Sequence, residues 1–159
     1  MLGAGGAARA VVATLAGAGV PELRLVNRTQ ATAIDLGVAF TPRDGRRIAI
    51  ERWAERDATL KDATLLVNTT SLGMKGQPPL EIDLARLKQG AIVYDFIYAP
   101  LETPLLAQAR RRGYVAVDGL GMLLHQAVPA FERWFGVRPK VTPELRALVV
   151  ADLAREGLA

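Results

Sequence analysis

The residues with the clearest chemical potential lie near the start of the chain, in the run Gly3-Ala4-Gly5-Gly6-Ala7-Ala8. Gly3 allows a tight turn, Gly5 lets the backbone approach a pyrophosphate, and the small Ala8 lets a helix pack closely on a strand. The amides at the helix start then face the phosphates, and the helix dipole favours their negative charge. This G-x-G-x-x-A spacing predicts a dinucleotide-binding loop, with a tight turn that binds nothing as the alternative.

A second group of polar residues, Asn27, Arg28 and Thr29, follows the next apolar run. An acidic residue at this position binds the 2′-hydroxyl of NAD, and its charge would repel the 2′-phosphate of NADP. A guanidinium instead pairs with that phosphate, and the Asn and Thr side chains can add hydrogen bonds. The group predicts selectivity for NADP. The alternative is that Arg28 is a solvated loop residue and that the three residues only cap the next helix.

Alternating strands and helices are predicted to position these two groups. Ala8, Val11, Val12 and Leu15 follow a helical spacing, and residues 23–26 form an apolar strand. Further strands are predicted at 46–50, 64–67, 91–95 and 114–117, and helices at 30–39, 52–61, 104–112, 122–134 and 143–155, with one helical turn at 83–87 and a turn at Pro42 and Asp44-Gly45. The pattern is typical of an α/β fold, a Rossmann-like doubly wound parallel sheet of about six strands with helices on both faces.

The first predicted strand is unusually short, because only Met1 and Leu2 precede Gly3, whereas about five residues are usual. We therefore expect this strand to be truncated, as if the chain began inside its own central strand. The 159 residues are expected to form one NADP-binding domain with helices at its C-terminus.

Composition narrows the classes of function. The chain has no cysteine and one histidine, so neither thiolate nor histidine-cluster metal sites are expected. Its net charge of +4 comes from scattered basic residues, and aromatic residues make up only 6%, which argues against nucleic-acid binding. No membrane-spanning run or signal peptide is evident, so a cytoplasmic location is expected.

Five motifs together resemble the shikimate and quinate dehydrogenase family, specifically its C-terminal NADP-binding domain. They are GAGGAARA at 3–10, NRT at 27–29, NTTSLGM at 68–74, VYDFIYAPLETPLL at 93–106 and DGLGMLLHQAVPAFERW at 118–134. The first three occur in other NADP domains as well, including that of glutamyl-tRNA reductase. The last two are more specific to this family.

The resemblance implies reversible, NADP-dependent reduction of 3-dehydroshikimate to shikimate. It implies that the cofactor is contacted by Gly3, Ala4, Gly5, Gly6, Ala7, Asn27, Arg28, Thr29, Thr70, Ser71, Phe96, Gly119 and Met122. It also implies that Tyr98 and Gln126 touch the bound shikimate. Met122 and Gln126 are four residues apart on one helical face, so an amide and a packing side chain can reach one site. Tyr98 and Gln126 could otherwise be a loop aromatic and a surface amide.

Two departures from the family pattern stand out. Thr32 occupies a position where the family often has a second basic residue, so NADP selectivity would rest mainly on Arg28. The family's catalytic lysine and aspartate belong to an N-terminal substrate domain that this chain lacks. Lys75 is interpreted as a solvated loop lysine, and Asp95 as a group that could orient its neighbours. Neither is assigned a catalytic role.

Three functions remain open at this stage. The chain could be the cofactor half of a shikimate dehydrogenase, which would need the missing domain to act on shikimate or 3-dehydroshikimate. In that case two copies of the chain could also form a homodimer. It could be a non-catalytic NADP-binding or regulatory module. It could be a different NADP reductase, such as glutamyl-tRNA reductase, but the motifs at 93–106 and 118–134 argue against this.

Overall fold

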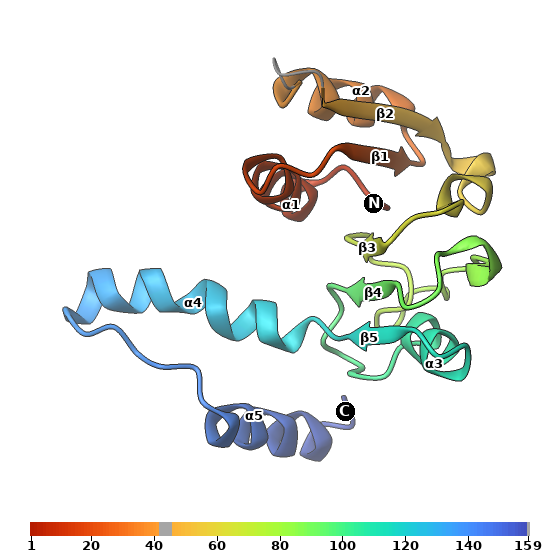
Figure 1. Cartoon of the computed structure of the whole chain (residues 1–159). Coiled ribbons are helices and arrows are strands. Elements are labelled where there is room, and N and C mark those ends of the chain that lie inside the picture. The colour runs from red at the N-terminus through yellow and green to blue at the C-terminus, as the bar shows by residue number, and fades with distance from the viewer. Residues whose placement is uncertain (42–45, 159) are drawn as a thin grey trace.

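The computed structural model describes residues 1–41 and 46–158 and shows a parallel α/β domain (Figure 1). The predicted turn at Pro42 and Asp44-Gly45 lies outside the described residues. The strands are β1 (Glu22–Asn27), β2 (Arg47–Arg52), β3 (Leu65–Asn68), β4 (Ile92–Asp95) and β5 (Val115–Val117). The helices are α1 (Gly6–Gly17), α2 (Gln30–Ala39), α3 (Pro104–Arg111), α4 (Leu120–Phe135) and α5 (Pro143–Arg155), with short 3-10 turns η1 (Trp53–Glu55), η2 (Ala58–Leu60) and η3 (Leu84–Arg86).

Leu2 joins the two parts of the sheet, in which β1 pairs with β2 and β3 with β4 and β5, all in parallel. On one side the Gly3 N–H donates to Val26 O at 2.8 Å. On the other side the Leu2 N–H donates to Val67 O and Leu2 O accepts from the Thr69 N–H, both at 2.8 Å. The predicted parallel α/β sheet is present, but the described residues form five strands rather than clearly six. The first predicted strand is present as a single bridge residue, Leu2, which pairs with Val26 and Asn68, in agreement with its predicted truncation.

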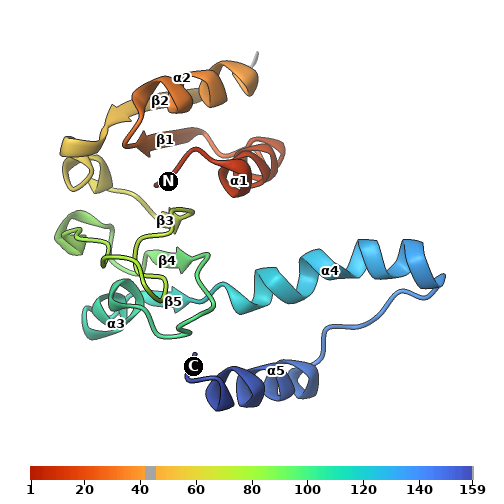
Figure 2. The same cartoon turned by 180° about the vertical axis from the view of Figure 1, so that it is seen from behind.

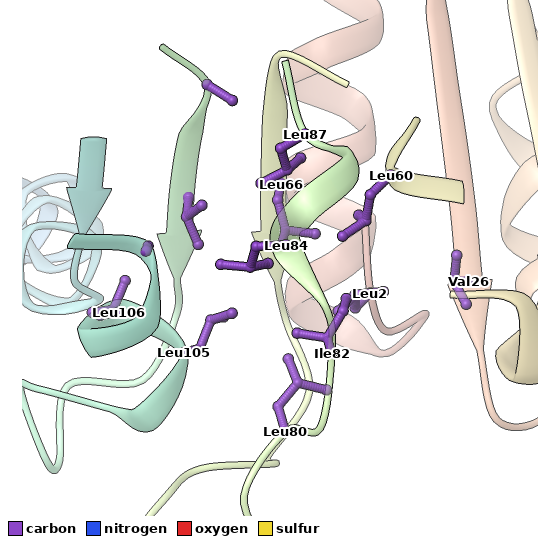
Figure 3. Close-up of a cluster of buried hydrophobic side chains, with 13 residues drawn as sticks. Leu2, Val26, Leu60, Leu66, Leu80, Ile82, Leu84, Leu87, Leu105 and Leu106 are labelled. Atoms are coloured by element: carbon purple, nitrogen blue, oxygen red, sulfur yellow. The ribbon is translucent and has the colours of Figure 1, made fainter. Parts of the chain in front are cut away.

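Helices cover both faces of the sheet, as the sequence predicts. Leu25 packs with α1 and α2, whereas its neighbour Val26 packs with η2, η3 and α3 on the other face. This alternation follows from the two-residue period of a strand. Figure 3 shows the second of these clusters, with Leu2 in the same group as Leu66 and Leu84. The truncated strand thus contributes a fully buried side chain as well as its backbone bonds.

The predicted helix at residues 52–61 is wrong, since this segment forms only the two turns η1 and η2. Long-range side-chain bonds hold the segment in this shape. The Arg24 guanidinium donates to Thr59 O at 2.8 Å, and Arg56 Nε donates to Glu81 O at 2.7 Å. These contacts with residues distant in sequence override a modest local preference for helix.

The last two helices lie partly outside the body of the sheet. Both views show α4 running outward from the end of β5 and α5 returning alongside it (Figure 1 and Figure 2). One ion pair anchors α5 to the start of α4: Arg146 donates to Asp118 Oδ2 at 2.5 Å, while Asp118 Oδ1 accepts from the Leu120 N–H at 3.0 Å. Trp134 is 77% exposed on the outer part of α4. No described helix combines the length and apolar character needed to cross a bilayer.

A cavity of about 390 Å³ lies beside Met1 and Leu2, between the starts of β1 and β3, with Leu23 and Leu65 among its lining residues. The Met1 amino group faces it and donates to Arg24 O at 2.7 Å. Burial, and secondarily the charge of Arg24, lowers the pKa of this amino group from 8.0 to about 5. Between about pH 5 and pH 8 the unfolded chain therefore binds a proton at this amine that the folded chain does not. The contribution of this amine to stability should be greatest above pH 8 and should fall as the pH drops towards 5.

We predict that adding about five apolar residues before Met1 raises the melting temperature. The added strand would fill the cavity and pair with β1 and β3, and 1 kcal/mol corresponds to about 2–4 °C at this size. The gain should be larger at pH 5.5 than at pH 8, by up to about 3 kcal/mol, because the buried amine becomes a peptide N–H. Thermal melts of both chains at both pH values measure these effects.

A five-residue Gly-Ser extension is the matched control. It moves the charged amine out of the cavity but supplies no apolar side chains. It should therefore remove the loss of stability at pH 5.5 but raise the melting temperature at pH 8 much less than the apolar extension does. Identical melting of all three chains at both pH values would show that Met1 and Leu2 suffice and that the amine is not buried.

Candidate functional site

The residues predicted to form a site all follow the carboxyl ends of strands. The turn after Leu2 holds Gly3, Ala4, Gly5, Gly6 and Ala7, and the end of β1 holds Asn27, Arg28 and Thr29. The segment after β3 holds Thr70 and Ser71, the segment after β4 holds Phe96 and Tyr98, and the segment after β5 holds Gly119, Met122 and Gln126. Because the strands are parallel, these segments share one edge of the sheet. The strand order reverses on either side of Leu2, where open α/β sheets form a crevice for ligands.

The turn after Leu2 exposes backbone amides. Gly3 has φ +96°, and a Cβ at this position would lie 2.5 Å from Thr69 Oγ1, so only glycine fits. Gly5 is the N-cap of α1, and no side chain of the described residues caps the first turn. Gly5, Gly6 and Ala7 are exposed, and the first turn contains no acidic residue. This helix start can therefore accept an anionic group such as a pyrophosphate.

The end of β1 carries a cationic side chain without a carboxylate beside it. Asn27 Nδ2 donates to Thr29 O at 2.8 Å, which shapes the turn into α2. Thr29 is the N-cap residue, but its side chain makes no capping hydrogen bond. The exposed Arg28 has no ion pair or hydrogen bond with any described residue. The geometry leaves the Arg28 guanidinium and the Thr29 hydroxyl available to a ligand.

Asn68, at the end of β3, organises the loop that carries Thr70 and Ser71. Asn68 is fully buried, and its Oδ1 accepts from the Thr70 N–H at 3.0 Å and from Thr70 Oγ1 at 2.7 Å. The Thr70 hydroxyl is thus used within the loop, whereas Ser71 is exposed. The sequence alone assigns Asn68 no role of its own. Its place immediately before Thr-Thr-Ser is the Asx-turn signal that could have revealed it.

Phe96 and Gly119 are in direct contact. A Cβ on Gly119 would lie 2.1 Å from Phe96 O, and the Gly119 N–H donates to Ile97 O at 2.9 Å. The Phe96 ring lies 4.9 Å from the ring of Tyr94. Gly119 caps α4, so this contact sets the position from which α4 presents Met122. Tyr98 and Gln126 are both exposed, and no hydrogen bond joins them in the described chain.

Two charged residues that the sequence singled out, Lys75 and Asp95, lie near this edge of the sheet. Lys75 is exposed in a loop, as predicted, and its Nζ donates one hydrogen bond to Gly157 O at 3.3 Å. Asp95 is fully buried, and burial raises the pKa of its carboxyl group. Across residues 1–41 and 46–158, no three His, Cys, Asp or Glu side chains gather as a metal site would require.

The sequence and the fold of this chain are similar to those of known proteins. The model of the shikimate 5′-dehydrogenase C-terminal domain family matches residues 119–148. The shikimate dehydrogenase (NADP(+)) of Methylobacterium radiotolerans is 61% identical over 154 residues, which are 97% of this chain and 53% of that protein. The chain spans about half the length of the curated relatives it matches.

Solved structures show the same fold. Quinate dehydrogenase from Corynebacterium glutamicum in complex with NAD has a TM-score of 0.83 at 31% identity, covering 94% of this chain and 53% of that chain. A shikimate dehydrogenase in complex with NADP+ has a TM-score of 0.75 at 32% identity, covering 95% and 52%. These findings confirm the predicted resemblance and the parallel α/β fold.

The contact between Gly119 and Phe96 predicts that Gly119→Ala destabilises the domain. The added methyl must displace the Phe96 carbonyl, which should cost about 1–3 kcal/mol or more in the free energy of unfolding. Gly121→Ala is the matched control, because nothing lies within 4 Å of a Cβ there. In a helix this second change should stabilise by about 0.5–1 kcal/mol. Urea denaturation measures both, and equal effects of the two changes would contradict the contact.

Proposed function

We propose that this chain is the NADP-binding domain of a shikimate dehydrogenase, an oxidoreductase that reversibly reduces 3-dehydroshikimate to shikimate with NADPH. The observation that carries the proposal is the pairing of the uncapped start of α1 with an exposed, unpaired Arg28 at the end of β1. The names of the relatives support the reaction and the cofactor, since shikimate dehydrogenases (NADP(+)) reach 61% identity.

The adenine half of the cofactor is proposed to bind through backbone amides and Arg28. The amides of Gly5, Gly6 and Ala7 would bind the pyrophosphate, because they begin α1 and are exposed. The guanidinium of Arg28 would pair with the 2′-phosphate, with Asn27 and Thr29 beside it. Thr32 offers no second positive charge, so the preference for NADP over NAD would depend mainly on Arg28.

The nicotinamide half is proposed to lie over the loops after β3, β4 and β5. Phe96, Gly119 and Met122 would line the ring, and Thr70 and Ser71 would lie close to it. When bound there, NADPH supplies the hydride. Tyr98 and Gln126 would contact shikimate or 3-dehydroshikimate, since both side chains are exposed at this edge and can donate hydrogen bonds to hydroxyl groups.

Reduction of a ketone also needs a proton for the developing alkoxide. Neither Lys75 nor Asp95 is assigned this role, because Lys75 is an exposed loop lysine and Asp95 is buried. By resemblance, the family's catalytic lysine and aspartate would come from a separate substrate domain. In this proposal the 159 residues bind and orient the cofactor, and the second domain holds and protonates the substrate.

We predict that Arg28→Ala weakens NADP binding and leaves NAD binding unchanged. Removing a charge-assisted contact should cost about 1.5–3 kcal/mol, which is a loss of about 10- to 150-fold in affinity. Arg133→Ala is the control, because Arg133 is an exposed arginine on α4. Calorimetric titration of NADP and NAD into the unmodified chain, Arg28→Ala and Arg133→Ala measures the affinity of each protein for each cofactor. Unchanged NADP affinity in Arg28→Ala would refute the assignment.

A second prediction is that this chain alone does not oxidise shikimate. Tyr98 and Gln126 would only touch the substrate, and by resemblance the lysine and aspartate that hold and deprotonate it belong to the separate domain. An assay with NADP+ and shikimate should therefore show only background rates. Adding a separately produced substrate domain from a close relative should restore turnover. Turnover by the chain alone that disappears in Lys75→Ala would make Lys75 catalytic. NADP binding with no turnover after complementation would favour a non-catalytic module.

A further inference from the structure

Asp95 is a fully buried carboxylate at the carboxyl end of β4, and none of the ion pairs of the described residues includes it. Three donors satisfy it instead. Thr103 Oγ1 donates to Oδ2 at 2.7 Å, while Asn68 Nδ2 and the Ile97 N–H donate to Oδ1 at 3.0 and 3.3 Å. A buried charge without a cation is costly, so a domain that needed only packing here would be better served by an apolar residue.

The three donors lead to different segments of the proposed nicotinamide half. Through Asn68, the carboxylate orients the amide whose other atom, Oδ1, holds Thr70. Through the Ile97 N–H, it fixes the loop between Phe96 and Tyr98. The carbonyl of Ile97 in turn accepts from the Gly119 N–H, which sets the start of α4.

The third donor closes the loop that contains Tyr98. Thr103 is the N-cap of α3, and its Oγ1 accepts from the Leu106 N–H at 3.3 Å while donating to Asp95. The loop from Tyr98 to Thr103 is therefore held at both ends by the same carboxylate. Burial raises the pKa of Asp95, while the hydrogen bonds from Thr103, Ile97 and Asn68 act in the opposite direction and favour the ionised acceptor.

We infer that Asp95 is a positioning residue for the nicotinamide half of the site, acting through Asn68, Ile97 and Thr103 rather than by contact with the ligand. The inference rests on the proposed function. Among the described residues, none of the hydrogen bonds to the Asp95 carboxylate comes from α1 or from the turn after β1. The adenine half of the site should therefore be insensitive to this carboxylate.

The test compares two ligands in one protein. NADPH needs both halves of the site, whereas adenosine 2′,5′-bisphosphate carries the 2′-phosphate but no nicotinamide. Asp95→Asn keeps the shape of the side chain but removes the charge and leaves one acceptor atom, so it cannot accept from Thr103 and from Asn68 and Ile97 at the same time. It should weaken NADPH binding about tenfold, as expected for loss of charge-assisted hydrogen bonds. Binding of the bisphosphate should change by less than about twofold.

Two controls separate positioning from loss of stability. Leu60→Ala removes a buried side chain beside the cavity at the opposite end of the strands. It should lower the melting temperature without changing the ratio of the affinities for NADPH and the bisphosphate. Hydrogen exchange gives the second readout. Asp95→Asn should accelerate exchange of the Thr70, Ile97 and Gly119 amides, while that of Val26 in β1 stays slow.

The affinities for NADPH and the bisphosphate decide whether Asp95 positions the nicotinamide half of the site. Parallel weakening of both ligands, or no weakening, would overturn the positioning role of Asp95. Equal affinity of the unmodified chain for NADPH and the bisphosphate would also overturn it, while leaving the adenine half of the proposed function intact. Failure of the unmodified chain to bind either ligand would refute the proposed function itself. If Asp95→Asn does not fold, Thr103→Val must show the same split and Thr103→Ser must lie closer to the original chain.

Discussion

The backbone of Leu2 holds the two parts of the sheet together. Its N–H and C=O bond to Val67 and Thr69, and the adjoining Gly3 N–H bonds to Val26, all at 2.8 Å. Without these bonds β1 and β2 would be separate from β3, β4 and β5. A parallel sheet needs every strand to be paired on both sides except at its edges. The whole carboxyl edge therefore depends on one short segment at the start of the chain.

This dependence explains why Gly3 has so little freedom. The chain must leave the centre of the sheet and enter α1 within a few residues, at a point where Thr69 approaches closely enough to exclude a Cβ. The same approach lets Thr69 Oγ1 donate to Leu2 O at 2.8 Å, so the turn and the ladder are fixed together. The exposed amides of the first turn of α1 are a consequence of that geometry, because a glycine N-cap has no side chain to cover them.

Local patterns predicted most of the fold, and long-range bonds account for the errors. The spacing of Ala8, Val11 and Leu15 predicted α1, and the glycine run and the group after β1 could be read as a cofactor site because each is contiguous in sequence. The helix at residues 52–61 was wrong, since bonds from Arg24 and to Glu81 shape that segment. The network around Asp95 could only be suspected, because its partners Asn68 and Thr103 lie 27 and 8 residues away.

The two halves of the proposed site are therefore built by different means. The adenine half uses backbone amides and a solvated arginine, which need only the local turns after Leu2 and β1. The nicotinamide half depends on side chains from β3, β4 and the start of α3, and no buried polar side-chain atom of the described residues lacks a partner. A satisfied buried network of this kind rigidifies its surroundings. Hydride transfer requires a fixed distance between two reacting carbons, whereas anchoring a phosphate tolerates more movement. The rigid network thus lies where the proposed chemistry requires precision, and the solvated contacts lie where binding affinity alone is needed.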